Sequence, residues 1–249
     1  MDIISARGLA VGYGTAEVLR DLSFVIPEGL ISVVLGVSGS GKSTLLKTLA
    51  GLLPPLEGGF EFSGAPVDYA SEASLGALYR RIGVLYQGGA LLNGLTLFEN
   101  IALPIRMHFP EMPEEMVKDM VHNGLAQVDM ADAAAKYPAE LSGGMRKRGA
   151  LARALVLDPD VVFCDEPSSG LDPITSSLLD DLLLRLKDTF GMTLVVVTHE
   201  LRSIERVADR VLVLNAGRLH YAGDAAGLSA SGDPFIRTFF LKKDSQDDA

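Results

Sequence analysis

The chain has 249 residues, of which 48% are hydrophobic and 22% charged, a composition typical of a folded protein with a sizeable apolar core. Its net charge of −10 disfavours binding to nucleic-acid phosphates, and its single cysteine, Cys164, excludes an internal disulfide framework and a thiolate metal cluster. No signal peptide is visible, and the longest charge-free stretch, residues 82–98, is too short and glycine-rich to span a membrane. We therefore expect another chain to mediate any contact with a membrane.

The predicted strands are of two kinds. Short apolar segments bounded by glycine or proline predict an antiparallel β layer from Leu9–Val11, Leu22–Ile26 and Gly59–Phe62. Later runs are β-branched and lack alternation, which is typical of strands buried on both faces of a parallel sheet. These runs are Ile31–Leu35, Val161–Cys164, Leu194–Val197 and Val211–Leu214, separated by predicted helices such as Ser43–Leu53 and Ser176–Phe190. The pattern predicts an α/β fold with a mostly parallel core sheet.

The stretch from about residue 88 to residue 140 differs from the rest of the chain. It is mostly helical in pattern and holds five of the eight methionines. We expect a helical insertion, reaching to about residue 148, in which these methionines fill an irregular core. The insertion is expected to belong to a single domain of residues 1–241, followed by a polar tail of residues 242–249.

A phosphate-binding loop is predicted where Gly-Val-Ser-Gly-Ser-Gly-Lys-Ser follows a buried strand and opens a helix. Its glycines let the backbone N–H groups turn towards phosphate oxygens, and the helix N-terminus favours negative charge. Lys42 is expected to reach the β- and γ-phosphates, and Ser43 to place its hydroxyl on Mg²⁺. The expected nucleotide-binding residues of this segment are Gly36, Ser38, Gly39, Ser40, Gly41, Lys42, Ser43 and Thr44.

Two acids end the apolar run that begins at Val161. A strand ending in acids delivers them to the carboxyl edge of a parallel sheet, where ligands bind. Asp165 is expected to hold Mg²⁺ through water, and Glu166 to orient or deprotonate an attacking water. Cys164 lies within the apolar run, which predicts a buried core residue.

With these motifs in place, the chain resembles the ATP-binding-cassette (ABC) ATPases over about residues 3–225. Leu141-Ser142-Gly143-Gly144-Met145 is similar to their signature motif, in which Gln is usual at the last position. The resemblance implies the P-loop NTPase ABC ATPase fold and the cofactors ATP and Mg²⁺. It also implies that Tyr13 stacks on adenine, that Gln87 is a catalytic and Mg²⁺-linked residue, that Ser169–Asp172 form the loop after the acids, and that His199 contacts the γ-phosphate.

The signature segment has the pattern of a helix start, with Ser142 as N-cap and free N–H groups at Gly143 and Gly144. Such an end binds anions, although a simple helix cap has the same pattern. The resemblance implies that this second anion site serves the ATP of a partner chain, so that a homodimer sandwiches two ATP molecules.

Within the family, the chain is most similar to the ATPases of Mla- and MCE-type lipid transporters. Leu-Ser-Gly-Gly-Met followed by Arg146–Arg148 carries this resemblance, as does the segment Tyr86–Pro104. Read alone, the basic run is typical of a solvent-exposed helix face. Two residues depart from the pattern: Gly149, where a bulkier apolar residue is expected and where glycine disfavours a helix, and Ser168, where Thr is usual.

These similarities imply an ATP-hydrolysing subunit at the cytoplasmic face of a bacterial inner membrane, which drives movement of phospholipid or related apolar molecules. An ABC importer ATPase for a small polar solute would carry the same core motifs. An ABC ATPase acting on DNA or ribosomes is disfavoured, because no coiled-coil insertion or second cassette is present, and a silent regulatory module is disfavoured because the acids, Lys42 and His199 are all in place.

The implied partners are an integral-membrane permease and an MCE-domain substrate-binding subunit, with no nucleic acid. Apolar residues within Leu91–Met107 predict a groove for a short permease helix, unless they pack only the core of the insertion. The apolar segment Pro234–Leu241 packs on its own domain or adds a contact between protomers.

Overall fold

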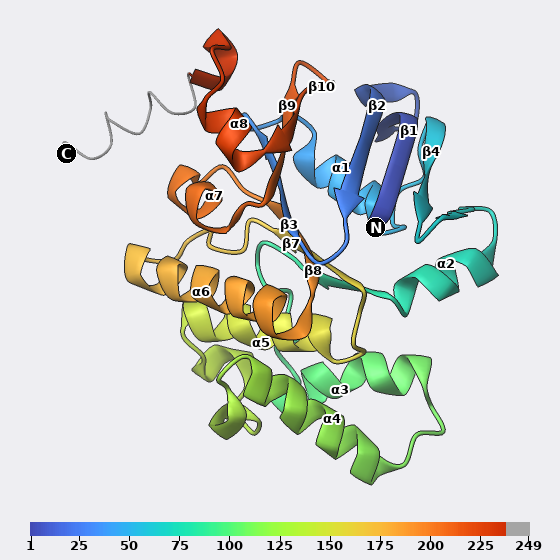
Figure 1. Ribbon diagram of the computed structural model, residues 1–249. Coiled ribbons are helices and arrows are strands. Elements are labelled where there is room, and N and C mark those ends of the chain that lie inside the picture. Colours follow the sequence, from blue (N-terminus) through green and yellow to red (C-terminus); the bar gives the residue numbers. More distant parts are fainter. Residues whose placement is uncertain (238–249) are drawn as a thin grey trace.

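The computed structural model describes residues 1–237, except for the side chains of Leu201, Arg202 and Ser229 (Figure 1). The predicted tail, residues 242–249, lies outside the described residues, as does the end of the apolar segment 234–241. Of that segment, Ile236 is buried and packs on the core of its own chain.

A six-stranded sheet lies at the centre of the fold. Its order is β10–β9–β3–β8–β7–β6, with the bounds Arg218–Asp224, Arg210–Asn215, Ile31–Gly36, Thr193–Val197, Val161–Asp165 and Ile82–Leu85. The strands from β9 to β6 are parallel, whereas β10 pairs antiparallel with β9. The predicted α/β fold with a mostly parallel core sheet is therefore confirmed.

The two edge strands of this sheet, β6 and β10, were not among the predicted strands. β6 is only four residues long and contains Gly83, and β10 alternates between exposed and half-buried positions. Neither strand therefore has the continuous β-branched run that marks the central strands, because an edge strand is less completely covered.

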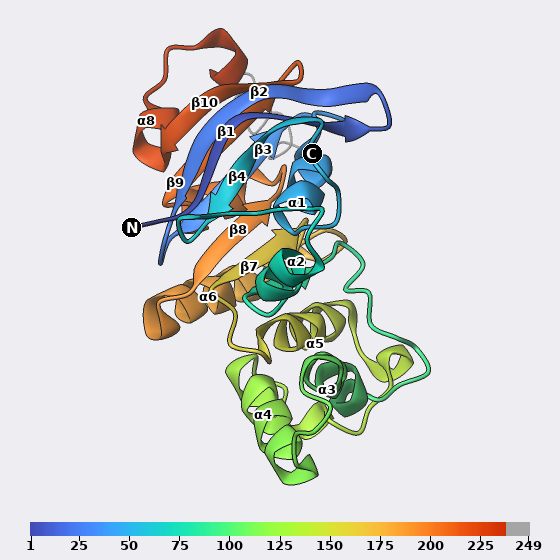
Figure 2. The same cartoon turned by 90° about the vertical axis from the view of Figure 1, so that its right-hand side faces the viewer.

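A second sheet is antiparallel and has the order β2–β1–β4–β5, with the bounds Ala16–Pro27, Asp2–Tyr13, Glu57–Phe62 and Ala65–Pro66. It confirms the predicted antiparallel layer, although β1 and β2 are 12 residues each and much longer than the apolar segments that indicated them. Helix α1 (Lys42–Leu49) packs between the two sheets, and α2 (Glu72–Tyr79) leads into β6 (Figure 2).

Alternate residues of the parallel strands enter two separate cores. In β7, Val161 and Phe163 face α1 and the antiparallel sheet, whereas Val162 and Cys164 face the opposite side. That side is covered by α5 (Gly143–Leu155), α6 (Pro173–Phe190) and α7 (Leu201–Val207). Burial on both faces explains why these strands are apolar without alternation, and Cys164 is buried as predicted.

The helical insertion follows β6 and precedes β7 in the chain. It contains α3 (Leu97–His108), α4 (Glu114–Gln127), the short 3₁₀ turns Ala131–Ala133 and Pro138–Glu140, and α5. In both views α3 and α4 lie at the end of the molecule opposite β1 and β2, and residue 148 falls inside α5. Helix α8 (Ala225–Ser229) follows β10.

The prediction that the methionines fill the core of the insertion is wrong for two of them. Met130 is buried, and Met112 and Met120 pack against the core, but Met107 and Met116 are exposed. The latter two lie near the turn between α3 and α4, where no other layer covers them.

Candidate functional site

The phosphate-binding loop connects β3 to α1, as its sequence predicts. Gly39 and Gly41 have φ values of 78° and 96°, in the left-handed region that glycine adopts without strain. Gly41 is also the N-cap residue of α1. A Cβ atom on Gly36 would lie 2.7 Å from the carbonyl oxygen of Leu214, so only glycine fits at the end of β3. The loop therefore has the geometry that a phosphate cradle needs.

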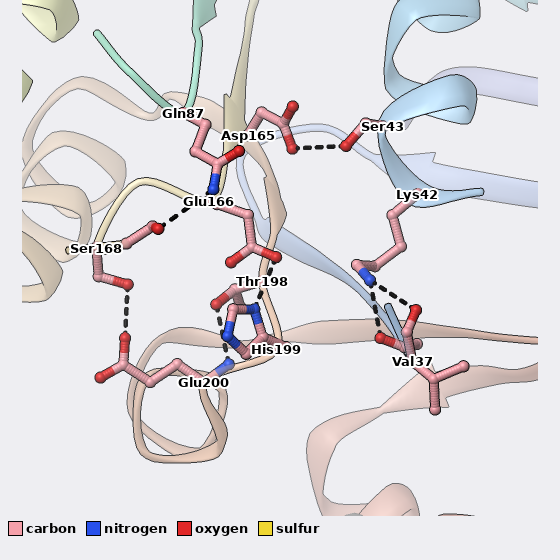
Figure 3. Close-up of polar contacts among 12 residues, drawn as sticks. Val37, Lys42, Ser43, Gln87, Asp165, Glu166, Ser168, Thr198, His199 and Glu200 are labelled. Atoms are coloured by element: carbon pink, nitrogen blue, oxygen red, sulfur yellow. Dashed lines mark hydrogen bonds and ion pairs between the residues drawn. The ribbon is translucent and has the colours of Figure 1, made fainter. Parts of the chain in front are cut away.

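Lys42, the first residue of α1, lies buried against this loop (Figure 3). Its Nζ donates hydrogen bonds to the carbonyl oxygens of Gly36 and Val37, at 2.8 and 3.1 Å. Burial lowers the pKa of the ammonium group, and the charges of Glu166 and Asp165 oppose this effect. The loop thus holds a cation beside the two acids that end β7.

The carboxyl edge of β7 brings Asp165 to the start of α1. The hydroxyl of Ser43 donates to Asp165 Oδ1 at 3.1 Å. Burial raises the pKa of Asp165, and the Ser43 hydrogen bond acts in the opposite direction. The described residues contain no group of three or more His, Cys, Asp or Glu side chains that could hold a metal. A hydroxyl and one carboxylate nevertheless fit Mg²⁺, which in nucleotide sites takes few protein ligands and the rest from phosphates and water.

Glu166 has an unusual backbone conformation, with φ at 47° in the left-handed region. Its N–H donates to Val197 O at 2.8 Å, which ties it to the end of β8. Glu166 Oε1 lies 2.9 Å from His199 Nδ1, and the histidine side chain is 70% exposed while the glutamate is only 13% exposed. The predicted carboxylate and histidine are therefore in contact, although 33 residues separate them in the chain.

Of two further predicted residues, Gln87 borders this cluster and Tyr13 lies beside α1. Gln87 follows β6, and its Nε2 donates to Ser169 Oγ at 3.3 Å, so it reaches the loop after the acids. Tyr13 ends β1 with half of its surface exposed, and Lys47 Nζ lies 5.9 Å from the centre of its ring. An exposed ring is available for stacking on a base.

The signature segment begins a helix, as predicted. Ser142 is the N-cap of α5, its hydroxyl accepts from Met145 N at 3.2 Å, and Gly143 and Gly144 form the first helical turn. Within residues 1–237, no hydrogen bond joins this segment to the phosphate-binding loop. The structure thus assembles the loop, the acids, Gln87 and His199 into one cluster and leaves the signature as a separate, capped helix start.

Two polar links in this region were missed by sequence reasoning. Ser168 Oγ donates to Glu200 Oε2 at 2.6 Å, which joins the loop after the acids to the segment after β8. Lys147 is buried and donates to the backbone carbonyls of Gln87 and Glu166, so the interpretation of the basic run as a solvent-exposed face is wrong for Lys147. Helical spacing could have indicated it, because Gly144, Lys147, Leu151 and Leu155 share one buried face of α5, whereas Arg146 is exposed.

A parallel sheet that places a phosphate-binding loop, two acids and a histidine at one edge defines a nucleotide-hydrolysing protein of the P-loop class. The family model described as ABC transporter matches residues 19–169. The chain therefore belongs to the ABC transporter family, and it is an ATP-binding, ATP-hydrolysing cassette of that family.

Curated relatives cover nearly the whole chain. A protein of Mycobacterium tuberculosis named "Probable ribonucleotide transport ATP-binding protein mkl" is 39% identical over 95% of this chain, which spans 66% of that relative's length. A protein of Escherichia coli named "Intermembrane phospholipid transport system ATP-binding protein MlaF" is 35% identical over 96% of this chain and 88% of the relative.

Solved structures of two cassettes also match most of the chain. The chain cbiO1 from Clostridium perfringens, part of the ABC transporter complex cbiONQ, superposes with a TM-score of 0.85 at 27% identity, covering 97% of this chain and 99% of that one. The cassette MJ0796, solved as a dimer bound to ADP and Pi, superposes with a TM-score of 0.80 at 28% identity, covering 89% and 98%.

Proposed function

We propose that this cassette is the ATPase of a bacterial inner-membrane transporter that moves phospholipid or related apolar molecules. The observation that carries the proposal is the similarity to MlaF, which extends over 96% of this chain and 88% of the relative. The Leu-Ser-Gly-Gly-Met signature and the segment Tyr86–Pro104 support it. The name of the mycobacterial relative favours the alternative, a transporter for a small polar solute such as a ribonucleotide.

The substrate is tested by reconstituting the cassette with its permease in liposomes. Fluorescent phospholipid movement and ATP turnover are measured in the presence of ATP, with a Glu166→Gln cassette as the inactive control. We expect ATP-dependent lipid movement and no stimulation of ATP turnover by other ribonucleotides. ATP turnover that rises only when a ribonucleotide other than ATP is added, without lipid movement, would establish the alternative.

The proposed roles of the site residues follow from their positions. The N–H groups of residues 36–44 and the Lys42 ammonium bind the phosphates, because they line one side of the cluster. Glu166 orients or deprotonates the attacking water, and His199, 2.9 Å from it, contacts the γ-phosphate. Tyr13 stacks on the adenine.

The proposed Mg²⁺ site consists of Ser43, Asp165 and the side chain of Gln87. Bound Mg²⁺ would supply neutralisation of charge on the β- and γ-phosphate oxygens. The protein's part is to hold hard oxygen donors at one place, and the 3.1 Å contact between Ser43 and Asp165 supports this arrangement.

We also propose a homodimer in which Ser142, Gly143 and Gly144 bind the γ-phosphate of the partner's ATP. The capped, glycine-rich start of α5 supports an anion site, and the hydrogen bonds of the phosphate-binding loop do not involve it. The dimeric MJ0796 cassette shows that a chain of this fold can pair. Residues 1–241 are proposed to form a single cassette with one helical insertion.

A permease and an MCE-domain subunit complete the proposed transporter, with the cassette peripheral on the cytoplasmic face of the inner membrane. None of the helices in residues 1–237 is both long and apolar enough to cross a membrane. A cavity of about 340 Å³ supports a permease docking site, and its walls include Gly88, Ala90, Leu91, Asn93, Pro138 and Arg146.

This cavity corrects the extent of the groove expected from Leu91–Met107. Leu97 and Ile101 are fully buried core residues, and Met107 does not line the cavity. The wall around Leu91 is fixed by the buried Asn100, whose side chain accepts from Leu92 N at 2.7 Å and donates to Leu95 O at 3.1 Å.

A further inference from the structure

Lys147 is a buried cation within α5, only 6% exposed. Its Nζ donates to the backbone carbonyl of Gln87 and, at 3.2 Å, to the backbone carbonyl of Glu166. Burying a charged ammonium is unfavourable unless hydrogen bonds compensate. The two carbonyls therefore fix where this side chain lies, and they belong to two different segments of the candidate site.

Glu166 needs such contacts because its left-handed backbone, with φ at 47°, is unfavourable for a residue with a side chain. Strained conformations persist only where the surrounding structure enforces them. The Glu166 N–H is held by Val197 O at 2.8 Å, and its carbonyl accepts from Ser169 N at 3.2 Å and from Lys147. Among these contacts, Lys147 is the one that comes from the helical insertion.

The same ammonium holds the Gln87 backbone, and the Gln87 side chain in turn reaches Ser169. Lys147 thus joins α5 to the loop after β6 and to the end of β7. A shift of α5 relative to the core sheet would move both carbonyls, and with them the Glu166 carboxylate.

We propose that Lys147 is a positioning residue for ATP hydrolysis. It holds the strained Glu166 backbone and the backbone of Gln87 in fixed positions. The position of the Glu166 carboxylate therefore depends on the position of α5. The inference rests on the role proposed above for Glu166. It predicts a defect in turnover and none in nucleotide binding, because Lys147 contacts neither the phosphate-binding loop nor Tyr13.

The test compares three variants of the 249-residue chain. Lys147→Met removes the charge and the donors at similar length, Lys147→Arg keeps a buried cationic donor, and Arg148→Met removes the neighbouring cation. Within residues 1–237, Arg148 makes no hydrogen bond to Gln87 or Glu166. The kcat and KM for ATP, the affinity for a fluorescent ATP analogue and the Tm are measured for each.

We expect Lys147→Met to lower kcat by about 10- to 100-fold, since small displacements of a reacting group cost rates of that order. KM, nucleotide affinity and Tm should stay near wild type, Lys147→Arg should restore most of the turnover, and Arg148→Met should leave it unchanged. An unchanged kcat in Lys147→Met would overturn the inference. So would a loss of turnover that is matched by losses in nucleotide affinity and Tm.

If Lys147→Met does not fold, Lys147→Leu, which also removes the charge and the donors, is judged by the same criteria. Failure of both to fold while Lys147→Arg and Arg148→Met fold would assign Lys147 to stability and overturn the inference. Wild-type turnover that is abolished by Glu166→Gln upholds the role proposed for Glu166 whatever Lys147 does. Absence of wild-type turnover would contradict the proposed function itself.

Discussion

At the scale of single residues, the site combines the Lys42 cation, the half-buried carboxylate of Asp165 and the carboxylate of Glu166, whose backbone is strained. The pKa values of Lys42 and Asp165 shift in opposite directions, because burial lowers the pKa of the ammonium and raises that of the carboxylate. An opposite charge nearby therefore stabilises the charged form of each group. A nucleotide with its metal would supply negative phosphates to Lys42 and a cation to Asp165.

Glu166→Gln should retain ATP binding and lose hydrolysis, because the amide preserves the shape of the side chain and cannot accept a proton. A general base accelerates a reaction by about 10²- to 10⁴-fold, and kcat should decrease by a factor in that range. Single-turnover hydrolysis and binding of a fluorescent ATP analogue measure the two properties separately. Lys42→Ala serves as the contrasting variant, since it should lose both. Near wild-type hydrolysis by Glu166→Gln would refute the role proposed for this carboxylate.

At the scale of elements, α5 approaches α3 closely because Gly149 has no side chain. A Cβ atom there would lie 2.6 Å from Leu97 Cδ1, and Leu97 is fully buried and cannot swing away. This contact explains why Gly149 departs from the bulkier residue expected at its position. Close packing of the two helices offsets the low helix propensity of glycine.

Gly149→Ala should therefore destabilise the chain by about 1–3 kcal/mol, the usual cost of overpacking a core. Gly124→Ala is the matched control in α4: its nearest neighbouring atom would lie at 3.6 Å, an ordinary contact, and alanine favours a helix over glycine by about 1 kcal/mol. Urea unfolding of both variants measures the difference. Equal or higher stability of Gly149→Ala would show that Leu97 yields and that the packing argument fails.

At the scale of the whole molecule, we propose that the phosphate-binding cluster and the signature helix are two separate anion sites on one chain. A head-to-tail dimer uses both, since each ATP would meet the loop of one chain and the signature of the other. The helical insertion also carries the cavity proposed for the permease. The same insertion would thus connect the membrane partner with both nucleotide sites.

Mixing Lys42→Ala chains with Ser142→Arg chains tests whether the signature acts in trans. Each variant alone should be inactive, because both composite sites of its homodimer are damaged. A mixed dimer keeps one site intact, so mixing should restore part of the ATP turnover. Light scattering at the assay concentration gives the oligomeric state of the wild-type chain. Full turnover by a chain that is monomeric under those conditions would exclude the trans arrangement.

Asn93→Arg should detach the cassette from its permease, because Asn93 is exposed and lines the cavity that we propose for docking. Pull-down of the permease measures the loss, and ATP binding by the isolated chain should persist. Met107→Arg is the control, since Met107 is also exposed in the insertion and lies outside the cavity walls. Loss of the complex with Met107→Arg but not with Asn93→Arg would place the docking surface elsewhere.

The sequence by itself determined the parallel strands β9, β3, β8 and β7, the phosphate-binding loop and the acids at the end of β7. These features depend on local requirements: β-branched residues for strands buried on both faces, and glycine for left-handed turns such as those at Gly39 and Gly41. Ser142 as a helix cap is equally local, since its hydroxyl bonds three residues along the chain. The ABC resemblance added Gln87 and His199.

Only the tertiary structure decided which side chains meet. The contact of His199 with Glu166, the bond of Ser168 to Glu200 and the buried bonds of Lys147 join residues between 19 and 60 positions apart. Such pairs depend on strand order and on how closely helices pack, which no local pattern encodes. The same reason explains why the sequence indicates only a weak helix position at Gly149, whereas the structure shows a point of close helix contact.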